Sequence, residues 1–401
     1  LEIERAEGVY LFDTSGKKTP SAPLGLEIER AEGVYLFDTS GKNYIDLISG
    51  IGVSALGHCH PKIVNAVQQQ AAKYMHTMVY GEYIQNPQVQ LAQLLCEVLP
   101  DSLNAVYFTN SGTEATEGAM KLSKRFTGRT EIISCYNSYH GSTQGALSLN
   151  GDEYFKSNYR PLLPDTRQIR YNNLDDIKLI TKRTAAVFLE PVQAEAGVIV
   201  PDENYLQAVR KRCNETGTLL VLDEIQTGCG RTGNLFRFQT ENVVPDILLV
   251  GKAFGGGLPL AAFISSKKIM NVFQQNPVLG HITTFGGNAV CCAAGLASLQ
   301  EIIEKKLYAD VERKAQLFIE LLQHKSIQKI HHCGLLMAVY LDNFDNLWKT
   351  IQVCLQNGLV TDWFLFANNC MRIAPPLIIT DEEIKTAATI IHQALDKVYN
   401  A

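Results

Sequence analysis

The 401-residue chain has no long apolar run, no Cys-x-x-Cys pair and no excess of basic residues. Its longest apolar stretches, such as residues 289–297, fall far short of the ~18 to 20 residues that cross a bilayer. Its 36 basic and 41 acidic side chains give a net charge of -5, which does not favour broad binding to nucleic acid. With 46% apolar and 19% charged residues, the composition is that of an ordinary folded protein. We therefore expect neither a membrane nor a nucleic-acid partner.

The cysteines show no pairing pattern. They are Cys59, Cys96, Cys135, Cys213, Cys229, Cys291, Cys292, Cys333, Cys354 and Cys370. We interpret them as reduced, mostly buried side chains rather than a disulfide framework. The first residues, LEIERAE, resemble neither a secretion signal nor an Arg-rich transit sequence. A cytoplasmic location is the default expectation.

Residues 1–17, LEIERAEGVYLFDTSGK, recur letter for letter at residues 26–42. Solenoid repeats diverge, occur at least three times and stack to share a core, whereas this is one perfect duplication. Only the second copy continues into a plausible fold. We therefore interpret residues 1–17 as a duplication artefact and leave them out of the functional argument.

Short apolar runs alternate with helical patterns from about residue 76 to 298. This alternation is typical of an α/β domain with a mainly parallel sheet between helices. A helix is predicted over residues 114–126, where Ala115, Ala119 and Leu122 share one face. Residues 289–304 predict a largely buried helix. Strands are predicted at residues 105–108, 131–135, 185–189, 218–222, 246–250 and 260–264.

The chain becomes more charged after residue 298. It ends in an amphipathic pattern that Thr380 and Glu383 can open as a capping box. We predict a large domain at residues 76–298 and a smaller α+β domain at residues 299–401. Residues 18–75 form an N-terminal segment that we expect to join the smaller domain.

Chemically suggestive side chains follow the predicted strands one after another. Ligands of open α/β sheets bind beyond the carboxyl ends of the strands, so these side chains predict a single site. In chain order they are Ser111, Gly112 and Thr113, then Tyr139 and His140, then Glu190, Asp223 and Lys252.

Three of these features together describe pyridoxal phosphate. Lys252 lies between an apolar strand and three glycines at 255–257, which suggests a desolvated amine able to form a Schiff base. Asp223 ends a buried strand, where a protonated ring nitrogen would satisfy its charge. Residues 111–113 precede a helix whose N-terminus can hold a phosphate. Taken singly, they could equally be a solvated lysine, a structural ion pair and an ordinary N-cap.

Two other motifs are weaker. Residues 228–233, GCGRTG, match the Gly-x-Gly-x-x-Gly dinucleotide pattern, but no amphipathic helix follows to hold a pyrophosphate. His58, Cys59 and His60 lack the spacing of metal ligands, and we interpret them as a structural loop.

Over residues 26–401 the sequence resembles the class III pyridoxal-phosphate aminotransferases of fold type I, which include acetylornithine, ornithine and 4-aminobutyrate aminotransferases. The motifs that carry the resemblance occur in the family's order. They are SG at 49–50, LGHCHP at 56–61, FTNSGTEA at 108–115, YHG at 139–141, LEPVQ at 189–193, DEIQTG at 223–228, GK at 251–252, TFGGN at 284–288 and RIAPP at 372–376.

The resemblance implies a role for each matching residue. Lys252 would hold the cofactor covalently and move a proton between substrate and cofactor. Asp223 would pair with the ring nitrogen, and Gln226 would reach the ring hydroxyl. The expected catalytic residues are thus Lys252 and Asp223. The cofactor-binding set is expected to be Ser111, Gly112, Thr113, Tyr139, His140, Asp223, Ile225, Gln226, Lys252 and Thr284.

Further implications concern the ring faces, the phosphate and the assembly. Tyr139 would stack on one face of the ring and Ile225 would pack on the other. Gly112 and Thr113 would bind the phosphate together with Thr284 of the partner subunit. The active enzyme is therefore expected to be at least a homodimer.

The expected substrate-binding residues are Arg372, Glu195 and Ser142. In the family the glutamate neutralises the arginine while an ω-amine donor is bound, then releases it to grip 2-oxoglutarate in a ping-pong reaction. A structural salt bridge is the alternative for this pair. Acetylornithine and ornithine members carry an arginine where this chain has Ser142, and a hydroxyl cannot replace a charged fork. The donor thus stays open among acetylornithine, ornithine, 4-aminobutyrate, diamines and other ω-amines.

Rival functions stay open as well. The same scaffold supports mutases, decarboxylases and racemases, and a non-catalytic protein could bind pyridoxal phosphate without exchanging amino groups. An oxidoreductase rests on residues 228–233 alone. Only an aminotransferase converts 2-oxoglutarate to glutamate as its donor is consumed.

Overall fold

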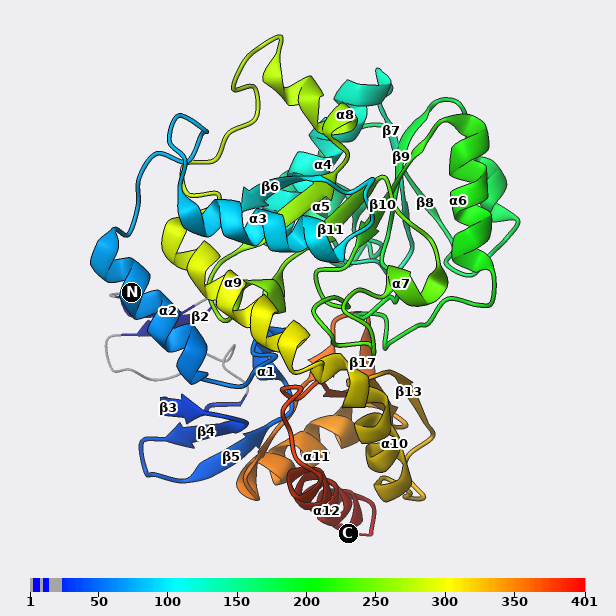
Figure 1. Cartoon of the computed structure of the whole chain (residues 1–401). Helices are drawn as coiled ribbons and strands as arrows, with labels where there is room; N and C mark the ends of the chain where they lie inside the picture. The colour runs from blue at the N-terminus through cyan, green and yellow to red at the C-terminus, as the bar shows by residue number, and fades with distance from the viewer. Residues whose placement is uncertain (1–2, 8–9, 14–23, 401) are drawn as a thin grey trace.

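The computed structural model describes residues 3–7, 10–13 and 24–400. Its centre is a seven-stranded sheet (Figure 1). In spatial order the strands are β6 (Ala105–Thr109), β12 (Ala261–Ser265), β11 (Ile247–Val250), β10 (Leu219–Asp223), β9 (Thr184–Leu189), β7 (Glu131–Cys135) and β8 (Thr166–Ile169). Only β12 runs against the others, so the sheet is mainly parallel as predicted.

Both faces of this sheet are covered, which explains why its central strands are apolar throughout. Along β10, Leu220 and Leu222 join the core on one face and Val221 joins the core on the other. Helix α4 (Gly112–Thr127) covers the Val221 face, and α6 (Tyr205–Thr216) packs on the opposite face. Parallel sheets need such cover on both sides.

The sequence patterns located most of these elements. All six predicted strands are present, with ends that differ by at most one residue. On α4, Ala115, Ala119 and Leu122 are buried against the sheet, as their spacing predicts. Strand β8 was not predicted because it lies at the sheet edge, where its sequence TRQI has a single apolar residue, Ile169.

Three long helices pack beside the sheet, and α9 (Ala289–Glu304) lies between the other two in contact with both. The other two are α2 (Pro61–Lys73) and α3 (Asn86–Val98) (Figure 1). The contacts on both sides account for the apolar first half of α9, and its bounds match the predicted helix. The cysteines form no disulfide, and seven of the ten are buried, as expected.

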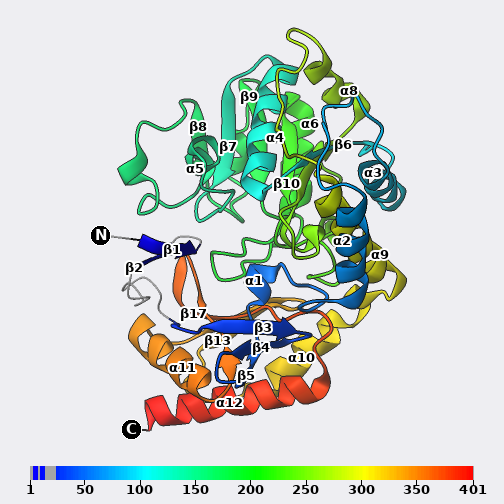
Figure 2. The same ribbon diagram turned by 90° about the vertical axis from the view of Figure 1, so that its left-hand side faces the viewer.

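The C-terminal part of the chain contains an antiparallel sheet below the large one (Figures 1 and 2). Its strands are β13 (Lys329–Cys333), β14 (Leu336–Tyr340), β17 (Ala367–Ile373) and β16 (Trp363–Phe364). The helices α10 (Val311–Leu321), α11 (Phe344–Gln356) and α12 (Asp381–Tyr399) accompany it.

A further four-stranded sheet joins an N-terminal segment to the C-terminal part of the chain. It contains β15 (Leu359–Val360), β5 (Asn43–Asp46), β4 (Tyr35–Asp38) and β3 (Ile28–Glu32). Because β5 pairs in parallel with β15, residues 28–46 share a sheet with a strand of the C-terminal part. The boundaries proposed for the domains stay a prediction.

The first copy of the duplicated sequence forms a hairpin of its own, β1 (Ile3–Glu7) and β2 (Tyr10–Asp13). Its pairing register repeats that of β3 and β4. Residues 1–2, 8–9 and 14–17 of this copy lie outside the described residues. The interpretation of residues 1–17 as an artefact is therefore still a prediction. No helix within the described ranges is long and apolar enough to span a membrane.

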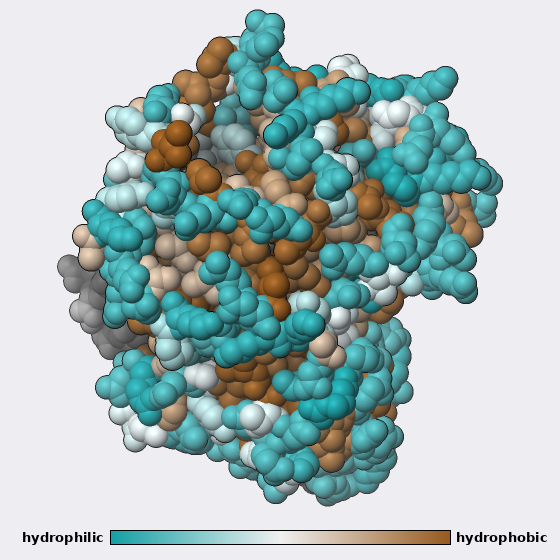
Figure 3. Space-filling model, viewed as in Figure 1, coloured by the Kyte–Doolittle hydropathy of each residue, from teal (hydrophilic) through white to brown (hydrophobic). Residues whose placement is uncertain are grey.

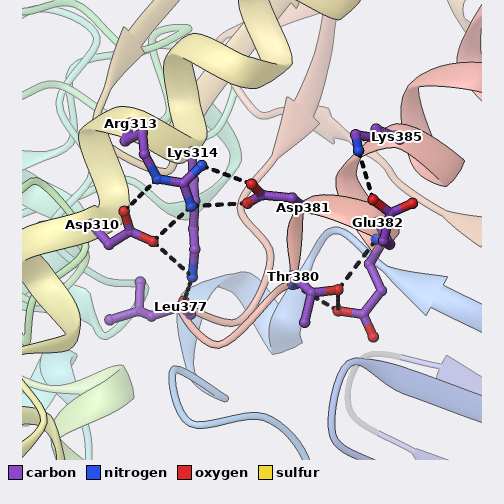
Figure 4. A network of polar contacts seen from close by, with 9 residues as sticks. Asp310, Arg313, Lys314, Leu377, Thr380, Asp381, Glu382 and Lys385 are labelled. Carbon is purple, nitrogen blue, oxygen red and sulfur yellow. Dashed lines mark hydrogen bonds and ion pairs between the residues drawn. The ribbon is translucent and has the colours of Figure 1, made fainter.

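A capping box opens α12, as predicted. Thr380 Oγ1 accepts a hydrogen bond from the Glu383 amide at 3.3 Å, and the Glu383 carboxylate accepts one from the Thr380 amide at 2.8 Å. Next to it, Arg313 bridges Asp310 and Asp381 (Figure 4). These contacts tie the beginning of α12 to α10.

Replacing Thr380 by alanine should lower the free energy of unfolding by about 1 kcal/mol, because an amide of the first turn loses its cap. A urea titration followed by circular dichroism measures this change. Thr386→Ala, at an exposed position inside the same helix, is the matched control and should cost less. Equal losses in the two variants would contradict the assigned cap.

Candidate active site

A cavity of about 420 Å³ opens at the edge of the sheet where β6, β7, β9, β10 and β11 end. All the predicted site residues line it except Thr284, Glu195 and Arg372. The lining residues are Ser111, Gly112, Thr113, Tyr139, His140, Gly141, Ser142, Thr143, Glu190, Asp223, Ile225, Gln226, Thr227 and Lys252.

Lys252 lies just beyond β11, in a strained backbone conformation. Its φ of 50° is in the left-handed region, which residues other than glycine rarely adopt and which recurs at functional sites. Its Nζ donates a hydrogen bond to Gln226 Oε1 at 2.6 Å. Desolvation lowers the pKa of Lys252, and the surrounding carboxylates oppose this shift without cancelling it. A lowered pKa increases the fraction of neutral, nucleophilic amine.

Asp223 ends β10 and is paired with His140. Its Oδ2 lies 2.7 Å from His140 Nδ1, and its Oδ1 accepts a hydrogen bond from the Ile225 amide at 3.1 Å. Burial alone would lower the pKa of His140, but the hydrogen bond and charge of Asp223, with the charge of Glu190, raise it overall. A carboxylate held in this way can face a protonated ring nitrogen without an isolated buried charge.

The N-terminus of α4 lines part of the cavity. Ser111 caps this 16-residue helix, since its Oγ accepts a hydrogen bond from the Glu114 amide at 3.3 Å. Within the described part of the chain, the amides of Gly112 and Thr113 donate to no protein acceptor. Free amides at the positive end of a helix dipole suit a phosphate. A Cβ at position 112 would lie 2.7 Å from Ile225 Cδ1, so any larger residue there would displace the end of the Ile225 side chain.

Tyr139 is held at both its backbone and its hydroxyl. Its amide donates to Glu190 Oε1 at 2.9 Å, and its hydroxyl lies 3.2 Å from the Ser142 hydroxyl. Ser142 is exposed at the cavity wall. An amine, a carboxylate, an aromatic ring and an anion-binding helix end thus face one space, and this donor set fits pyridoxal phosphate.

Glu195 and Arg372 form a buried ion pair behind Gln226. The arginine donates from NH1 and NH2 to the two carboxylate oxygens at 2.9 and 3.1 Å. Gln226 Nε2 lies 3.4 Å from Glu195 Oε1, so a hydrogen-bonded chain leads from Lys252 to the pair. Burial would raise the pKa of Glu195, but the charge and hydrogen bonds of Arg372 hold it at about 2.

Thr284 does not line the cavity either, and it lies outside the hydrogen-bonded chain that connects Glu195 and Arg372 to it. It is exposed, in the segment that precedes α9. Gly112 and Thr113, the other predicted phosphate ligands, line the cavity, whereas Thr284 does not.

Glu190 is among the side chains predicted at the strand ends, but it belongs to neither the predicted cofactor-binding nor the predicted substrate-binding set. Its two carboxylate oxygens accept hydrogen bonds from the amides of Tyr139 at 2.9 Å and Ala194 at 3.2 Å. Burial raises the pKa of Glu190 to about 7, although His140 and these two amides oppose the shift. Its place directly after β9 is the sequence signal that would add Glu190 to the cofactor-binding set.

The two weaker motifs serve other contacts. Arg231, inside the 228–233 segment, donates to the carbonyls of Leu335 and Pro375. The helix that follows, α7 (Phe238–Glu241), has only four residues. His58 Nε2 lies 2.8 Å from Asp46 Oδ2, which links the His58 loop to β5.

The sheet order and the cavity define a pyridoxal-phosphate-dependent transferase of fold type I. More particularly, the chain belongs to the class III aminotransferases, because the sequence profile of that family, aminotransferase class-III, matches residues 16–395. The chain is 38% identical to an acetylornithine aminotransferase from Methanopyrus kandleri, covering 88% of this chain and 90% of that protein. It is 36% identical to an acetylornithine aminotransferase from Clostridium acetobutylicum, covering 88% and 92%.

Solved structures agree with this assignment. An ornithine aminotransferase from Toxoplasma gondii ME49 superposes with a TM-score of 0.89 at 29% identity, over 95% of this chain and 93% of that chain. Another structure of the Toxoplasma gondii ornithine aminotransferase, with partial occupancy of pyridoxal phosphate at its active site, has a TM-score of 0.86 and 30% identity over 94% and 91%. Class III aminotransferases depend on pyridoxal phosphate.

Replacing Glu190 by glutamine should change the pH dependence of stability. Since the pKa of Glu190 is about 7 in the folded protein and 4.5 ordinarily, its proton stabilises the fold below about pH 4.5, and this contribution is lost as the pH rises through 7. From pH 4.5 to 7, cofactor-free wild type should therefore lose on the order of 3 kcal/mol relative to Glu190→Gln.

Urea unfolding of both proteins at several pH values measures this difference. Glu320→Gln, at an exposed position on α10, gives the effect of a surface substitution. A difference between wild type and Glu190→Gln that stays constant with pH would contradict the prediction.

Proposed function

We propose that this aminotransferase moves an amino group from an ω-amine donor, such as acetylornithine or ornithine, to 2-oxoglutarate by a ping-pong reaction. The observation that carries the proposal is that Lys252, Asp223 and the α4 N-terminus share one cavity. A hydrogen-bonded chain connects this cavity to the Glu195–Arg372 pair.

Lys252 would hold the cofactor through its Nζ and later carry the proton that leaves the donor carbon. Its lowered pKa supports both roles, because a neutral amine can attack a carbonyl and accept a proton. Bound pyridoxal phosphate supplies an electron sink for the charge left by that proton. Asp223, held by His140 at 2.7 Å, would keep the ring nitrogen protonated.

The other cavity residues would orient the ring. Tyr139 and Ile225 would cover its two faces, and Gln226 would reach its hydroxyl. Gly112 and Thr113 would bind the phosphate through amides that no acceptor among the described residues occupies. Ser111 supports them as the cap of the same helix.

Arg372 would grip a carboxylate of 2-oxoglutarate. The pair as it stands leaves no free positive charge, which suits an ω-amine donor. A 2-oxo acid would take the place of Glu195 on the NH1 and NH2 groups, since a guanidinium fork fits one carboxylate at a time.

The donor is constrained less tightly. The names of the relatives favour acetylornithine, whereas Ser142 offers a hydroxyl where acetylornithine and ornithine members carry an arginine. The Ser142 hydroxyl can donate a hydrogen bond to the far end of a donor but cannot neutralise a carboxylate. A neutral donor end therefore fits this wall without a cation, and for a donor carboxylate, as in acetylornithine or ornithine, Ser142 can act only as a neutral hydrogen-bond donor.

We also propose a homodimer in which Thr284 of the partner subunit completes the phosphate site. Thr284 lies on a surface formed by residues 76–85 and 275–285, on which Ile84, Val278 and Phe285 are exposed apolar side chains. Figure 3 shows apolar areas between polar side chains at its upper left. His76 and Phe285 bring the two segments of this surface together, with ring centroids 5.0 Å apart. Several large apolar side chains exposed near one another are typical of association surfaces.

Lys252→Ala should reduce turnover on the order of 10³-fold or more, because the covalent anchor and the proton carrier are both lost. It should also lose the adduct that borohydride reduction traps on the wild type, detected by mass spectrometry. Lys267→Ala, an exposed lysine on α8 (Lys267–Met270), is the control. An adduct that survives in Lys252→Ala would show that another lysine carries the cofactor.

Arg372→Ala should raise the KM for 2-oxoglutarate about 10- to 100-fold, since a charge-assisted hydrogen-bonded pair is lost. Glutamate formation is measured with a panel of donors that includes acetylornithine, ornithine, 4-aminobutyrate and a diamine. Arg170→Ala removes an exposed ion pair and is the control. An unchanged KM would exclude Arg372 as the acceptor ligand, and consumption of a donor without glutamate formation would favour a mutase or decarboxylase.

A further inference from the structure

A second carboxylate, Asp362, holds Arg372 on the side away from Glu195. Asp362 Oδ1 accepts a hydrogen bond from Arg372 Nε at 2.8 Å, and the Trp363 carbonyl accepts one from NH2 at 3.0 Å. Glu195 occupies the end of the guanidinium, through NH1 and NH2. The two acids thus bind different edges of the same cation.

The short segment 361–364 surrounds Arg372 on its remaining sides. The ring of Phe364 lies below the guanidinium, with its centroid 4.3 Å from Cζ. The Arg372 amide donates to the Asp362 carbonyl at 2.9 Å, and the Thr361 hydroxyl donates to the Arg372 carbonyl at 2.6 Å. These contacts arise because β16 pairs with β17 through an irregular register that folds residues 361–364 around Arg372.

The two carboxylates that bind Arg372 differ in exposure and in the edge of the guanidinium that they occupy. The Asp362 side chain is 20% exposed, while those of Arg372 and Glu195 are 3% and 4% exposed. An arginine has five N–H donors in a rigid plane, so a carboxylate on Nε leaves the NH1 and NH2 end available to another carboxylate. If Glu195 moves away, Asp362, Trp363 and Phe364 still hold the guanidinium in place.

We propose that Asp362 is a positioning residue for the acceptor half of the reaction. It anchors Arg372 at Nε while Glu195 and the carboxylate of the 2-oxo acid exchange at the other end. The guanidinium then needs no reorientation when the partner changes, and its fork is already set for the acceptor. This inference rests on the proposed function, because it assumes that Arg372 binds the acceptor.

The test measures the two half-reactions of the holoenzyme separately. Asp362→Ala should raise the KM for 2-oxoglutarate about 10- to 100-fold, the loss of one hydrogen bond to a charged group. The half-reaction with the best donor of the panel should keep its kcat and KM, because the donor does not use the fork. Asp362→Asn keeps an oxygen that can accept from Nε, and it should recover part of the loss.

A second measurement avoids turnover. Glutarate has the carboxylate ends of 2-oxoglutarate without the keto group, and its inhibition constant against 2-oxoglutarate should rise by the same factor in Asp362→Ala. Asp246→Ala is the matched control. Asp246 also pairs with an arginine, Arg210, at 2.8 Å, and its side chain is 29% exposed. It precedes the first residue of β11, at the end of the strand away from the cavity. The Asp246→Ala variant should leave both half-reactions unchanged.

Equal changes in the two half-reactions, or an unchanged KM for 2-oxoglutarate in Asp362→Ala, would overturn the inference. If Asp362→Ala does not fold, the same comparison is made with Asp362→Asn. A change confined to the half-reaction with 2-oxoglutarate supports the inference, and equal changes in both half-reactions contradict it. A failure of the proposed function looks different. If the proposed function is wrong, the wild type forms no glutamate from 2-oxoglutarate, or Arg372→Ala leaves the KM for 2-oxoglutarate unchanged. Both proposals are then refuted.

Discussion

The common direction of five strands is the constraint on which the rest of this structure depends. Strands β6, β7, β9, β10 and β11 all end at one edge of the sheet, so the residues that follow them meet there. A mainly parallel sheet must be covered on both faces, and α4 covers one of them while its N-terminus opens into the cavity. The packing that stabilises the sheet thereby also provides the anion site.

The charges beside this edge are balanced in pairs. Asp223 faces His140, and Arg372 faces Glu195, while Gln226 connects the second pair to Lys252. Breaking a buried pair by removing one member is costly, so each pair tolerates exchange of a partner better than its loss. Under the proposed function this favours the replacement of Glu195 by a substrate carboxylate over an unpaired Arg372.

Local patterns in the sequence predicted the elements that build the site. The six strands and α9 were located to within one residue, because apolar runs and helical spacing report burial directly. The same reasoning placed Lys252 and Asp223 after neighbouring strands, and the structure brings them to one cavity. It did not find β8, an edge strand with few apolar residues, nor Asp362, which has no motif around it.

The sequence by itself determined the kinds of chemical group and their order along the chain: an amine after one strand, a carboxylate at the end of another, and a helix N-terminus with small residues. Only the tertiary structure decided which of these groups touch. Glu195 and Arg372 are 177 positions apart, and only the family resemblance relates them in the sequence. Asp362, which the resemblance does not single out, reaches Arg372 through an irregular strand pairing. Such contacts depend on how separate sheets pack and on the register of their strands, and neither leaves a periodic trace in the sequence.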